Sequence, residues 1–435
     1  MIIGKEQLIF MQINPIDKFC DHSISIRRMV PLRRKDVTAL NLLLYIFNGK
    51  TKKYPNRQLF SQALNHAYAL RAYSNVSGFG DQVMLDIRFS WLSEDLVNEE
   101  GYIEEIRDLM DQILFHPCIT EKNLEEAKYL LRNRLMMQAQ DPDTQAVRLL
   151  LNSMPADHPI SIPVQGSLDQ IDAISLDQIR KLADDLSKTP VEIIGVGSIE
   201  KPILEYLDQF EQTKYTYHGS RLIDLDTPVI SEKSRDIAQS SLAMLYATHM
   251  KPDSPDYFAM MVMNAILGSA PMNLLFEEIR EKHSYCYSIS SSLIRFDGAL
   301  LIVTGAQKEH FEEIRDLIGQ QIEKLKHARE QIREEQLENA RLDLIDSIRS
   351  QQDSAVRLIA QSFMNAYLKR EITPEQMYEK IRAVTLEDVE KAASGLSLIG
   401  VASVLQSDGS TGQEEEEFSS MLSETVDVSQ EVEDE

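Results

Sequence analysis

The sequence predicts an α+β protein of two homologous domains, each with an antiparallel-rich sheet covered by helices. Its 435 residues exceed the size at which a single hydrophobic core stops growing, roughly 250 to 300 residues. Segments of the first half return in the second half in the same order. Within each half, short alternating runs are mixed with longer amphipathic ones, which predicts strands and covering helices in one unit.

The repeat is carried by four segments that return 205 to 210 residues later. They are EEIRDLMDQI at 104–113 and EEIRDLIGQQI at 312–322, AVRL at 146–149 and 355–358, SLDQIRKLADDLS at 175–187 and TLEDVEKAASGLS at 385–397, and IGVGS at 194–198 and IGVAS at 399–403. A single match of this kind could be chance, but four in one order indicate an internal duplication. The unit of about 200 residues has an ordinary domain size.

Each copy is expected to hold the same series of elements. An alternating strand comes first, then an apolar helix, a short helix with a strand pair, a charged amphipathic helix and a long helix pair. The ranges in the two copies are 23–29 and 242–250, 37–48 and 255–267, 57–90 and 271–306, 102–114 and 309–326, and 120–153 and 331–369. Ser175 and Thr385 then precede a last helix as N-caps, with Gln178 in a capping-box position, and a β-branched strand ends each copy.

These elements set the expected domain boundaries. The first domain covers 1–210 and the second covers 236–406, joined by an irregular, polar linker at 211–235. Residues 407–435 form an acidic tail whose composition cannot bury enough apolar surface to order itself, so we expect it to be disordered.

Charge and composition exclude several classes of function. The formal net charge of −24 argues against nucleic acid and anionic membrane surfaces as partners, because phosphate binding needs a basic footprint. No apolar stretch reaches the 18 residues of a membrane span, and the N-terminus lacks the pattern of a signal peptide. Three widely spaced cysteines, Cys20, Cys118 and Cys286, form no CxxC pair. The sequence therefore predicts a cytoplasmic protein.

The segment FEEIREKHSYCYSISSS at 276–292 begins as a charged helix and ends as an alternating strand. Arg280 and Tyr287 lie seven residues apart across this junction, with the helix expected to end at about Cys286. Both side chains are donors suited to hold a peptide carbonyl and stabilise an oxyanion. A structural role is the alternative, in which Arg280 caps carbonyls or pairs with a neighbouring glutamate while Tyr287 packs into a core.

Other candidates near the junction have a plainer interpretation. His283 has no second ligand at metal-binding spacing, so we expect a surface or hydrogen-bonded histidine. Strand alternation turns Cys286 toward the core as a small hydrophobe. Gly268 is expected in a simple turn, because a phosphate-binding loop would need more glycines and a lysine.

The quoted junction, as LLFEEIREKHSYCYSI, resembles the second domain of insulinase-like (pitrilysin) zinc peptidases of the small two-domain type. Further similar segments are GKTKKYPNRQLFSQAL, VQGSLDQIDAISLDQI and PDSPDYFAMMVMNAILG, so the resemblance covers about residues 1–405. It implies two homologous domains in a clamshell, with Arg280 and Tyr287 at the positions of the family's Arg and Tyr pair. INPIDKF and NGKTKKYP also resemble the non-zinc member of a Firmicutes pair associated with elongation factor P 5-aminopentanol modification.

The family's zinc signature, HxxEH on the first helix, is absent. With FNG at 47–49 as the anchor, its three positions fall on Leu40, Leu43 and Leu44. Leucine can neither bind a metal nor accept a proton, and no other histidine pair has the four-residue helical spacing. The third ligand, a glutamate expected in the helix starting near Glu121, would have no partners. We therefore expect no metal in this chain and no peptidase activity by the chain alone.

Within the family, this pattern implies a division of labour between two subunits. This chain would be the non-zinc subunit of a heterodimeric metallopeptidase, with Arg280 and Tyr287 assisting the zinc site of a paralogous partner on unfolded peptides. The alternative is an inert structural or peptide-binding scaffold, which the narrower resemblance would place in a translation-factor modification pathway. The sequence leaves the peptide substrate open.

Overall fold

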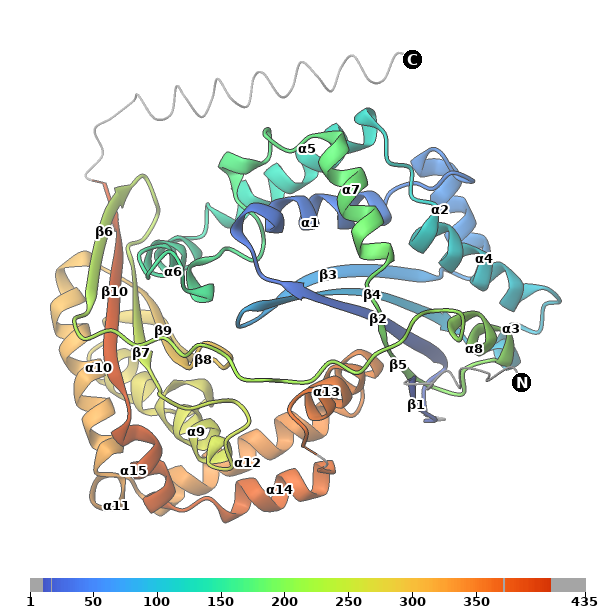
Figure 1. The fold of residues 1–435 in the computed structure, drawn as a ribbon. Coiled ribbons are helices and arrows are strands. Elements are labelled where there is room, and N and C mark those ends of the chain that lie inside the picture. Colours follow the sequence, from blue (N-terminus) through green and yellow to red (C-terminus); the bar gives the residue numbers. More distant parts are fainter. Residues whose placement is uncertain (1–10, 17, 371, 408–435) are drawn as a thin grey trace, which may run out of the picture.

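The computed structural model describes residues 11–16, 18–370 and 372–407. Two five-stranded sheets, each covered by helices, lie side by side and form the two domains of an α+β fold, as predicted (Figure 1). Residues 408–435, nearly all of the expected acidic tail, lie outside the described residues. No helix within the described ranges has the length and apolar character needed to cross a membrane.

The first domain contains strands β1 to β5 and most of the helices up to α8. Its strands are β1 (Gln12–Asn14), β2 (Asp21–Pro31), β3 (Arg71–Phe79), β4 (Gln82–Leu92) and β5 (Glu192–Val196). Its helices are α1 (Arg34–Phe47), α2 (Arg57–His66), α3 (Glu94–Val97), α4 (Tyr102–Phe115), α5 (Glu121–Gln138), α6 (Pro142–Asn152), α7 (Leu176–Ser187) and α8 (Lys201–Leu207), with short 3₁₀ turns η1 (Pro159–Ser161) and η2 (Leu168–Gln170).

The second domain repeats this series. Its strands are β6 (Val229–Arg235), β7 (Ser241–Ala247), β8 (Cys286–Ile294), β9 (Ala299–Ala306) and β10 (Ser397–Gln406). Its helices are α9 (Tyr257–Asn264), α10 (Phe311–Lys326), α11 (Ala328–Gln331), α12 (Glu334–Gln351), α13 (Ala355–Tyr367), α14 (Pro374–Ala383) and α15 (Leu386–Ser394), together with π-helical turns η3 (Ala265–Ser269) and η4 (Phe276–Lys282) and the 3₁₀ turn η5 (Lys308–His310).

The two sheets have the same strand order, which agrees with the internal duplication. The first is β1-β5-β2-β4-β3 and the second is β6-β10-β7-β9-β8. In each sheet the first pair is parallel and the remaining pairs are antiparallel. Ser175 and Thr385 are the N-caps of α7 and α15, and each forms a full capping box. Two backbone N–H groups that lack an acceptor within the helix are therefore hydrogen-bonded at each helix start.

The linker differs from expectation in its second half. Residues 229–235 are not irregular: they form β6, which pairs in parallel with β10 from Val229 to Arg235. The strand was missed because it is an edge strand with mostly exposed polar residues and only Val229 and Ile230 as apolar members. Edge strands of this kind carry little of the hydrophobic pattern from which strands are predicted.

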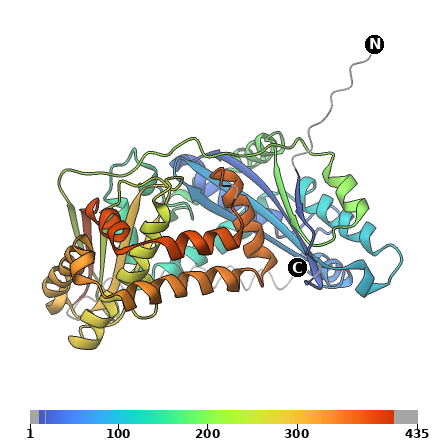
Figure 2. The same cartoon turned by 90° about the horizontal axis from the view of Figure 1, so that it is seen from below.

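The two domains exchange one helix each. Helix α6 of the first half packs its Ala146 and Leu150 on the second sheet, while α13 of the second half packs Ala355 and Ile359 on the first sheet. Ala146 and Ala355 begin the repeated AVRL segment, and Leu150 and Ile359 directly follow it, so both pairs are equivalent positions 209 residues apart. In the view of Figure 2, the orange helix α13 lies beside the blue strands of the first sheet. Each sheet is therefore covered on its second face by the other domain.

An aromatic cluster closes the joint between the domains. Phe79, at the end of β3, lies 4.8 Å from Phe296 of the β8–β9 turn and 5.7 Å from Phe363 of α13, measured between ring centres. Gly80 follows with φ +64°, and a Cβ there would lie 3.0 Å from the Cβ of Ser220. Glycine is thus required by both the backbone conformation and the close approach of the connecting segment.

Candidate functional site

The three positions of the zinc signature lie in a hydrophobic core. Leu40, Leu43 and Leu44 of α1 are 1%, 0% and 5% exposed and belong to the core cluster formed with β2, β4, α4 and α5. Helix α1 is apolar around most of its surface because it is covered by α5, α7 and β3. Leucine side chains have no donor atoms, so the chemistry of this site does not fit a metal ion.

Helix α5, where the third ligand was expected, contains the acidic residues Glu121 and Glu126. Glu121 opens the helix behind the N-cap Thr120, and Glu126 pairs with Lys50 and Arg57, each at 2.5 Å between nitrogen and oxygen. Across the described part of the chain, no group of three or more His, Cys, Asp or Glu side chains is arranged to hold a metal ion.

The structure brings Arg280 and Tyr287 together. The Arg280 Cζ lies 5.3 Å from the centre of the Tyr287 ring and 4.6 Å from that of Phe276, so the guanidinium is held by two aromatic rings. Tyr287 is 80% exposed, the highest value among the exposed large hydrophobic side chains. Two residues seven apart in sequence thus form one contact at the outer edge strand of the second sheet.

The local backbone conformation explains why Arg280 and Tyr287 are in contact. Helix η4 ends at Lys282, four residues before the expected end at Cys286, and Ser284 adopts the left-handed conformation with φ 58°. The Ser284 and Tyr285 N–H groups donate to the carbonyls of Arg280 and Ile279, which closes the helix end. The end expected at Cys286 is too late because no glycine marks the end of the helix.

A β-bulge then sets the direction of Tyr287. Cys286 pairs with Ala306 and Ser288 with Gly305, so Tyr287 is the extra residue of the bulge. Cys286 is buried as predicted, and burial raises the pKa of its thiol. The bulge therefore turns Cys286 into the core and Tyr287 toward solvent, which re-aims one side chain at a strand start.

The side-chain donors of Arg280 and Tyr287 have no acceptor in the described part of the chain. Among the described residues, no carboxylate forms an ion pair with Arg280, including its neighbours Glu277 and Glu281. Its guanidinium also donates to no carbonyl there, and the Tyr287 hydroxyl has no protein partner in the same ranges. The geometry therefore lacks the capping and core-packing contacts of the structural alternative.

His283 and Gly268 have structural surroundings. The Nε2 of His283 lies 3.7 Å from Glu278 Oε1, and Glu278 also pairs with Lys282, which lowers the pKa of its carboxyl. Gly268 lies in η3, not in the simple turn that the sequence suggested. A Cβ at Gly268 would lie 2.6 Å from the Oγ of Ser291, so glycine allows β8 to pack closely on this helix.

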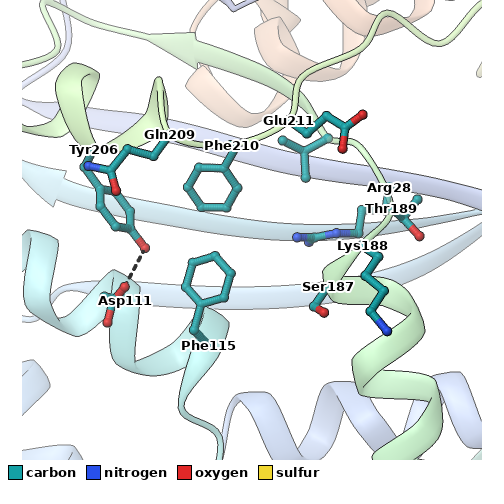
Figure 3. A pocket seen from close by; sticks show the side chains of 11 residues that line it. Arg28, Asp111, Phe115, Ser187, Lys188, Thr189, Tyr206, Gln209, Phe210 and Glu211 are labelled. Carbon is teal, nitrogen blue, oxygen red and sulfur yellow. Dashed lines mark hydrogen bonds between the residues drawn. The ribbon is translucent and has the colours of Figure 1, made fainter.

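Two further clusters had no sequence signal. The first is a pocket in the helix layer of the first domain, lined by Arg28, Phe115, Tyr206 and Phe210 among others (Figure 3). Arg28 lies in an alternating strand whose pattern predicts only the face to which each residue points. Which helix ends meet around that residue depends on tertiary packing.

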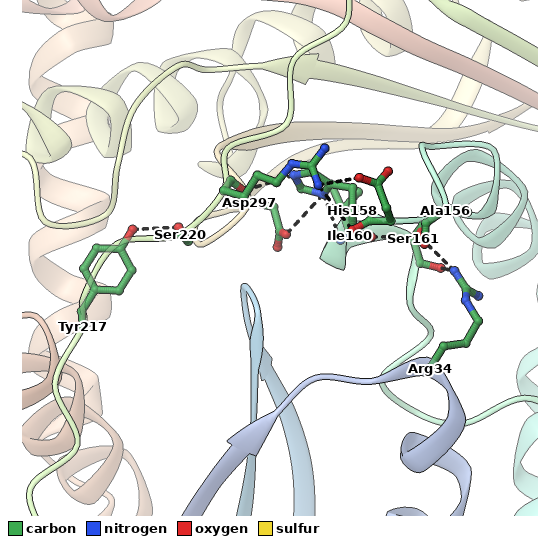
Figure 4. Close-up of polar contacts among 10 residues, drawn as sticks. Arg34, Ala156, His158, Ile160, Ser161, Tyr217, Ser220 and Asp297 are labelled. Atoms are coloured by element: carbon green, nitrogen blue, oxygen red, sulfur yellow. Dashed lines mark hydrogen bonds and ion pairs between the residues drawn. The ribbon is translucent and has the colours of Figure 1, made fainter.

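The second cluster lies at the domain joint (Figure 4). His158 is buried, its Nε2 lies 3.1 Å from the Arg221 carbonyl, and its Nδ1 accepts from the Ile160 N–H. Asp297 of the β8–β9 turn lies 3.9 Å from the same Nδ1 and is 8% exposed. Burial, with a smaller contribution from Asp81, raises the pKa of Asp297 to about 7.

Comparison with known proteins agrees with this architecture. Residues 173–344 match the family model described as the peptidase M16 inactive domain. YmfF of Bacillus subtilis, a probable inactive metalloprotease, is 22% identical over 394 residues, covering 88% of this chain and 92% of its own. The zinc protease YmxG of the same organism is 21% identical over 296 residues, covering 66% of this chain and 71% of its own.

The fold is shared with solved structures. A conserved protein from Enterococcus faecalis has a TM-score of 0.83 at 21% identity, covering 92% of this chain and 97% of its own. At this identity the likeness concerns the fold, which is the two-domain arrangement described above. Together with the family model that matches residues 173–344, these findings show that the chain is similar to M16, or insulinase-like, peptidases and to their inactive relatives.

Proposed function

We propose that this chain is the non-zinc subunit of a heterodimeric M16-type metallopeptidase. In this proposal Arg280 and Tyr287 bind the peptide and stabilise the transition state at the zinc site of a paralogous partner. The observation that carries the proposal is the contact between these two side chains, with a highly exposed Tyr287 and with donors on both that have no acceptor among the described residues.

The chemistry follows from the types of donor. A guanidinium is permanently charged and a phenol donates one directed hydrogen bond, so both stabilise the negative charge that develops on a peptide carbonyl under attack. The two rings that hold Arg280 limit the freedom of its side chain before any substrate binds. Such preorganised donors lose less entropy in the transition state than free ones.

The partner is proposed from two observations. The zinc positions of this chain are buried leucines, so an attacking water would have to be activated elsewhere. The chain is also similar to a zinc protease, YmxG, as well as to the inactive YmfF, so proteins of both kinds exist in this family. Cys20, Cys118 and Cys286 are all free thiols, which supports a cytoplasmic location for the proposed complex.

The experiment mixes this chain with a zinc-bearing M16 paralogue from the same genome and measures assembly and peptide cleavage separately. Arg280→Ala and Tyr287→Phe are each expected to lower the cleavage rate by about 10² to 10³ without loss of the complex. Lys282→Ala is the control for the arginine, because Lys282 is on the same helix and contacts only Glu278 among the described residues. Tyr129→Phe, at another exposed tyrosine, is the control for the phenol.

An inert peptide-binding or structural scaffold is the second candidate. The observation that favours it is the complete replacement of the zinc signature by core leucines, which shows that α1 serves packing. Normal cleavage with Arg280→Ala and Tyr287→Phe in an assembled complex would favour the scaffold. Absence of cleavage and of assembly with every zinc-bearing paralogue would reject the heterodimeric peptidase.

A further inference from the structure

The pocket of Figure 3 lies where three helices of the first domain end. Helix α4 ends at Phe115, α7 at Ser187 and α8 at Leu207, and the segments that follow them form the walls. The pocket has a volume of about 240 Å³, below the size of pockets for drug-like molecules and suitable for a small organic ligand. It lies in the helix layer of the first domain, whereas Arg280 and Tyr287 belong to the second domain.

Arg28 enters this pocket from the sheet. Its neighbours Ile24 and Ile26 on the same face of β2 pack in the helix-covered core, so alternation directs Arg28 toward the helices as well. The residue is only 9% exposed. Figure 3 shows its guanidinium extending toward the rings of Phe115 and Phe210, whose centres lie 5.4 Å apart.

The charge of Arg28 has no counter-ion among the residues that the structure describes. Within residues 11–16, 18–370 and 372–407, no carboxylate lies at ion-pair distance from it, and its buried Nε has no hydrogen-bond partner. Its neighbour Arg27 is different, because that side chain donates to Ser25 and pairs with Asp86 at 3.6 Å. A buried charge without a partner carries a desolvation cost that no attraction offsets. Pairing of an anion with the guanidinium of Arg28 would therefore contribute favourably to the free energy of binding.

The rim of the pocket restricts the charge of that anion. Asp111 and Glu211 both line the pocket, and Asp111 already accepts from the Tyr206 hydroxyl at 3.4 Å. The Nζ of Lys188 donates a hydrogen bond to Asp184, which is not one of the residues that line the pocket. Among the cationic side chains of the lining, Arg28 is therefore the one available to pair with a ligand. Two carboxylates disfavour a dianion such as a phosphate monoester, while one guanidinium suits a single carboxylate.

We propose that this pocket binds a small monocarboxylate with an apolar group. The carboxylate pairs with the guanidinium of Arg28, and the apolar group packs on Phe115 and Phe210. Such a carboxylate can come from a free organic acid or from the C-terminus of a peptide, and the two share the same recognition chemistry.

The test uses the full chain and four probes in titration calorimetry. 3-Phenylpropionate represents a free acid and N-acetylphenylalanine a peptide C-terminus; N-acetylphenylalaninamide lacks the charge, and benzyl phosphate is a dianion. Binding of either acid, with at least tenfold weaker binding of the amide and of the phosphate, is expected. The acid that binds more tightly identifies the source of the carboxylate.

Arg28→Met keeps the length of the side chain and removes the charge, so it should weaken binding of the acid at least tenfold. It should not lower the melting temperature of the unliganded protein, because it removes an unpaired buried charge. Arg71→Met is the matched control, since Arg71 is an exposed arginine of the same sheet, paired with Asp21. Unchanged acid binding in Arg28→Met would overturn the proposal.

A second variant keeps the test valid if Arg28→Met does not fold. Phe115→Trp places a partly exposed reporter in the pocket wall with Arg28 intact, while the single native tryptophan, Trp91, is buried elsewhere. The acids should change its fluorescence in a saturable way. Absence of a change with both acids up to about 10 mM, or equal responses to acid and amide, would reject the carboxylate site.

Discussion

Arg28 and Arg280 show how differently two arginines of one chain are used. Arg280 lies between two aromatic rings beside an exposed tyrosine, where its charge stays close to solvent. Arg28 is buried and pairs with no carboxylate of residues 11–16, 18–370 and 372–407, and burial lowers its pKa from the usual value. Both lack an acceptor among the described residues, so both remain available to an external anion or carbonyl. At the scale of residues, unused donors are the common feature of the two proposed sites.

A prediction about metal belongs to this scale. Purified protein should contain no stoichiometric zinc, because Leu40, Leu43 and Leu44 offer no donor atom. Metal analysis after gel filtration checks this, and dialysis against a chelator should leave the melting temperature unchanged. One tightly bound zinc ion per chain would contradict the assignment of these positions.

Asp297 gives a prediction about pH. Its pKa is raised to about 7 in the folded protein, mainly by burial, whereas an unfolded aspartate titrates near 3.9. The folded state therefore holds a proton that the unfolded state has lost between these values. The resulting stability is present below about pH 4 and is lost as the pH rises to about 7, with a slope of roughly 1.4 kcal/mol per pH unit in between.

Asp297→Asn should remove this dependence. His158 acts in the opposite direction, because burial lowers its pKa and the folded protein then loses stability as the pH falls below about 6.5. The quantity to measure is therefore the difference in unfolding free energy between the variant and the wild type at pH 5 to 8, from urea titrations. A difference independent of pH would show that Asp297 is ionised in the folded protein throughout.

At the scale of elements, the exchanged helices α6 and α13 make each domain depend on the other. Ile359 of α13 is fully buried against Ile194 and Val196 of the first sheet, although α13 lies between strands β9 and β10 of the second sheet in the chain. Leu150 of α6 has the equivalent place on the second sheet. The connection between the domains is also fixed to α13, because the Tyr217 N–H donates to the Tyr367 carbonyl.

Ile359→Ala should therefore lower the free energy of unfolding by about 2 to 5 kcal/mol, the usual cost of a core truncation to alanine. Val356→Ala is the matched control, because Val356 is an exposed residue on the same helix and its truncation should cost less than about 0.5 kcal/mol. Urea unfolding of both variants checks the prediction. Equal, small losses would mean that α13 is not held on the first sheet.

At the scale of the whole molecule, the interlocked domains predict one cooperative unfolding transition. Separate domains with a small polar interface can unfold in two steps, but here each sheet loses a covering helix when the other domain unfolds. Fluorescence of Trp91 reports the first sheet, and far-ultraviolet circular dichroism reports both domains. Coincident transitions are expected from the two probes; a separated second transition would contradict the coupling.

The sequence by itself determined the duplication, the α+β class and most helices, because these depend on local patterns that repeat along the chain. It also selected Arg280 and Tyr287 through their similarity to a family segment. It placed the helix end at Cys286 instead of Lys282 and missed β6, since a left-handed serine and a polar edge strand carry weak local signals. The role proposed for the pair stays a prediction.

Only the tertiary structure decided which sheet each helix covers and which buried charges lack partners. The same AVRL segment lies within α6 and at the start of α13, but its sequence does not indicate that each helix packs on the other domain's sheet. Arg27 and Arg28 are neighbours in one strand. Only the packing around the strand places Arg27 beside Asp86 and Arg28 in the wall of an open pocket. The physical reason is that contacts between distant segments depend on the assembled fold, whereas periodicity and capping are local.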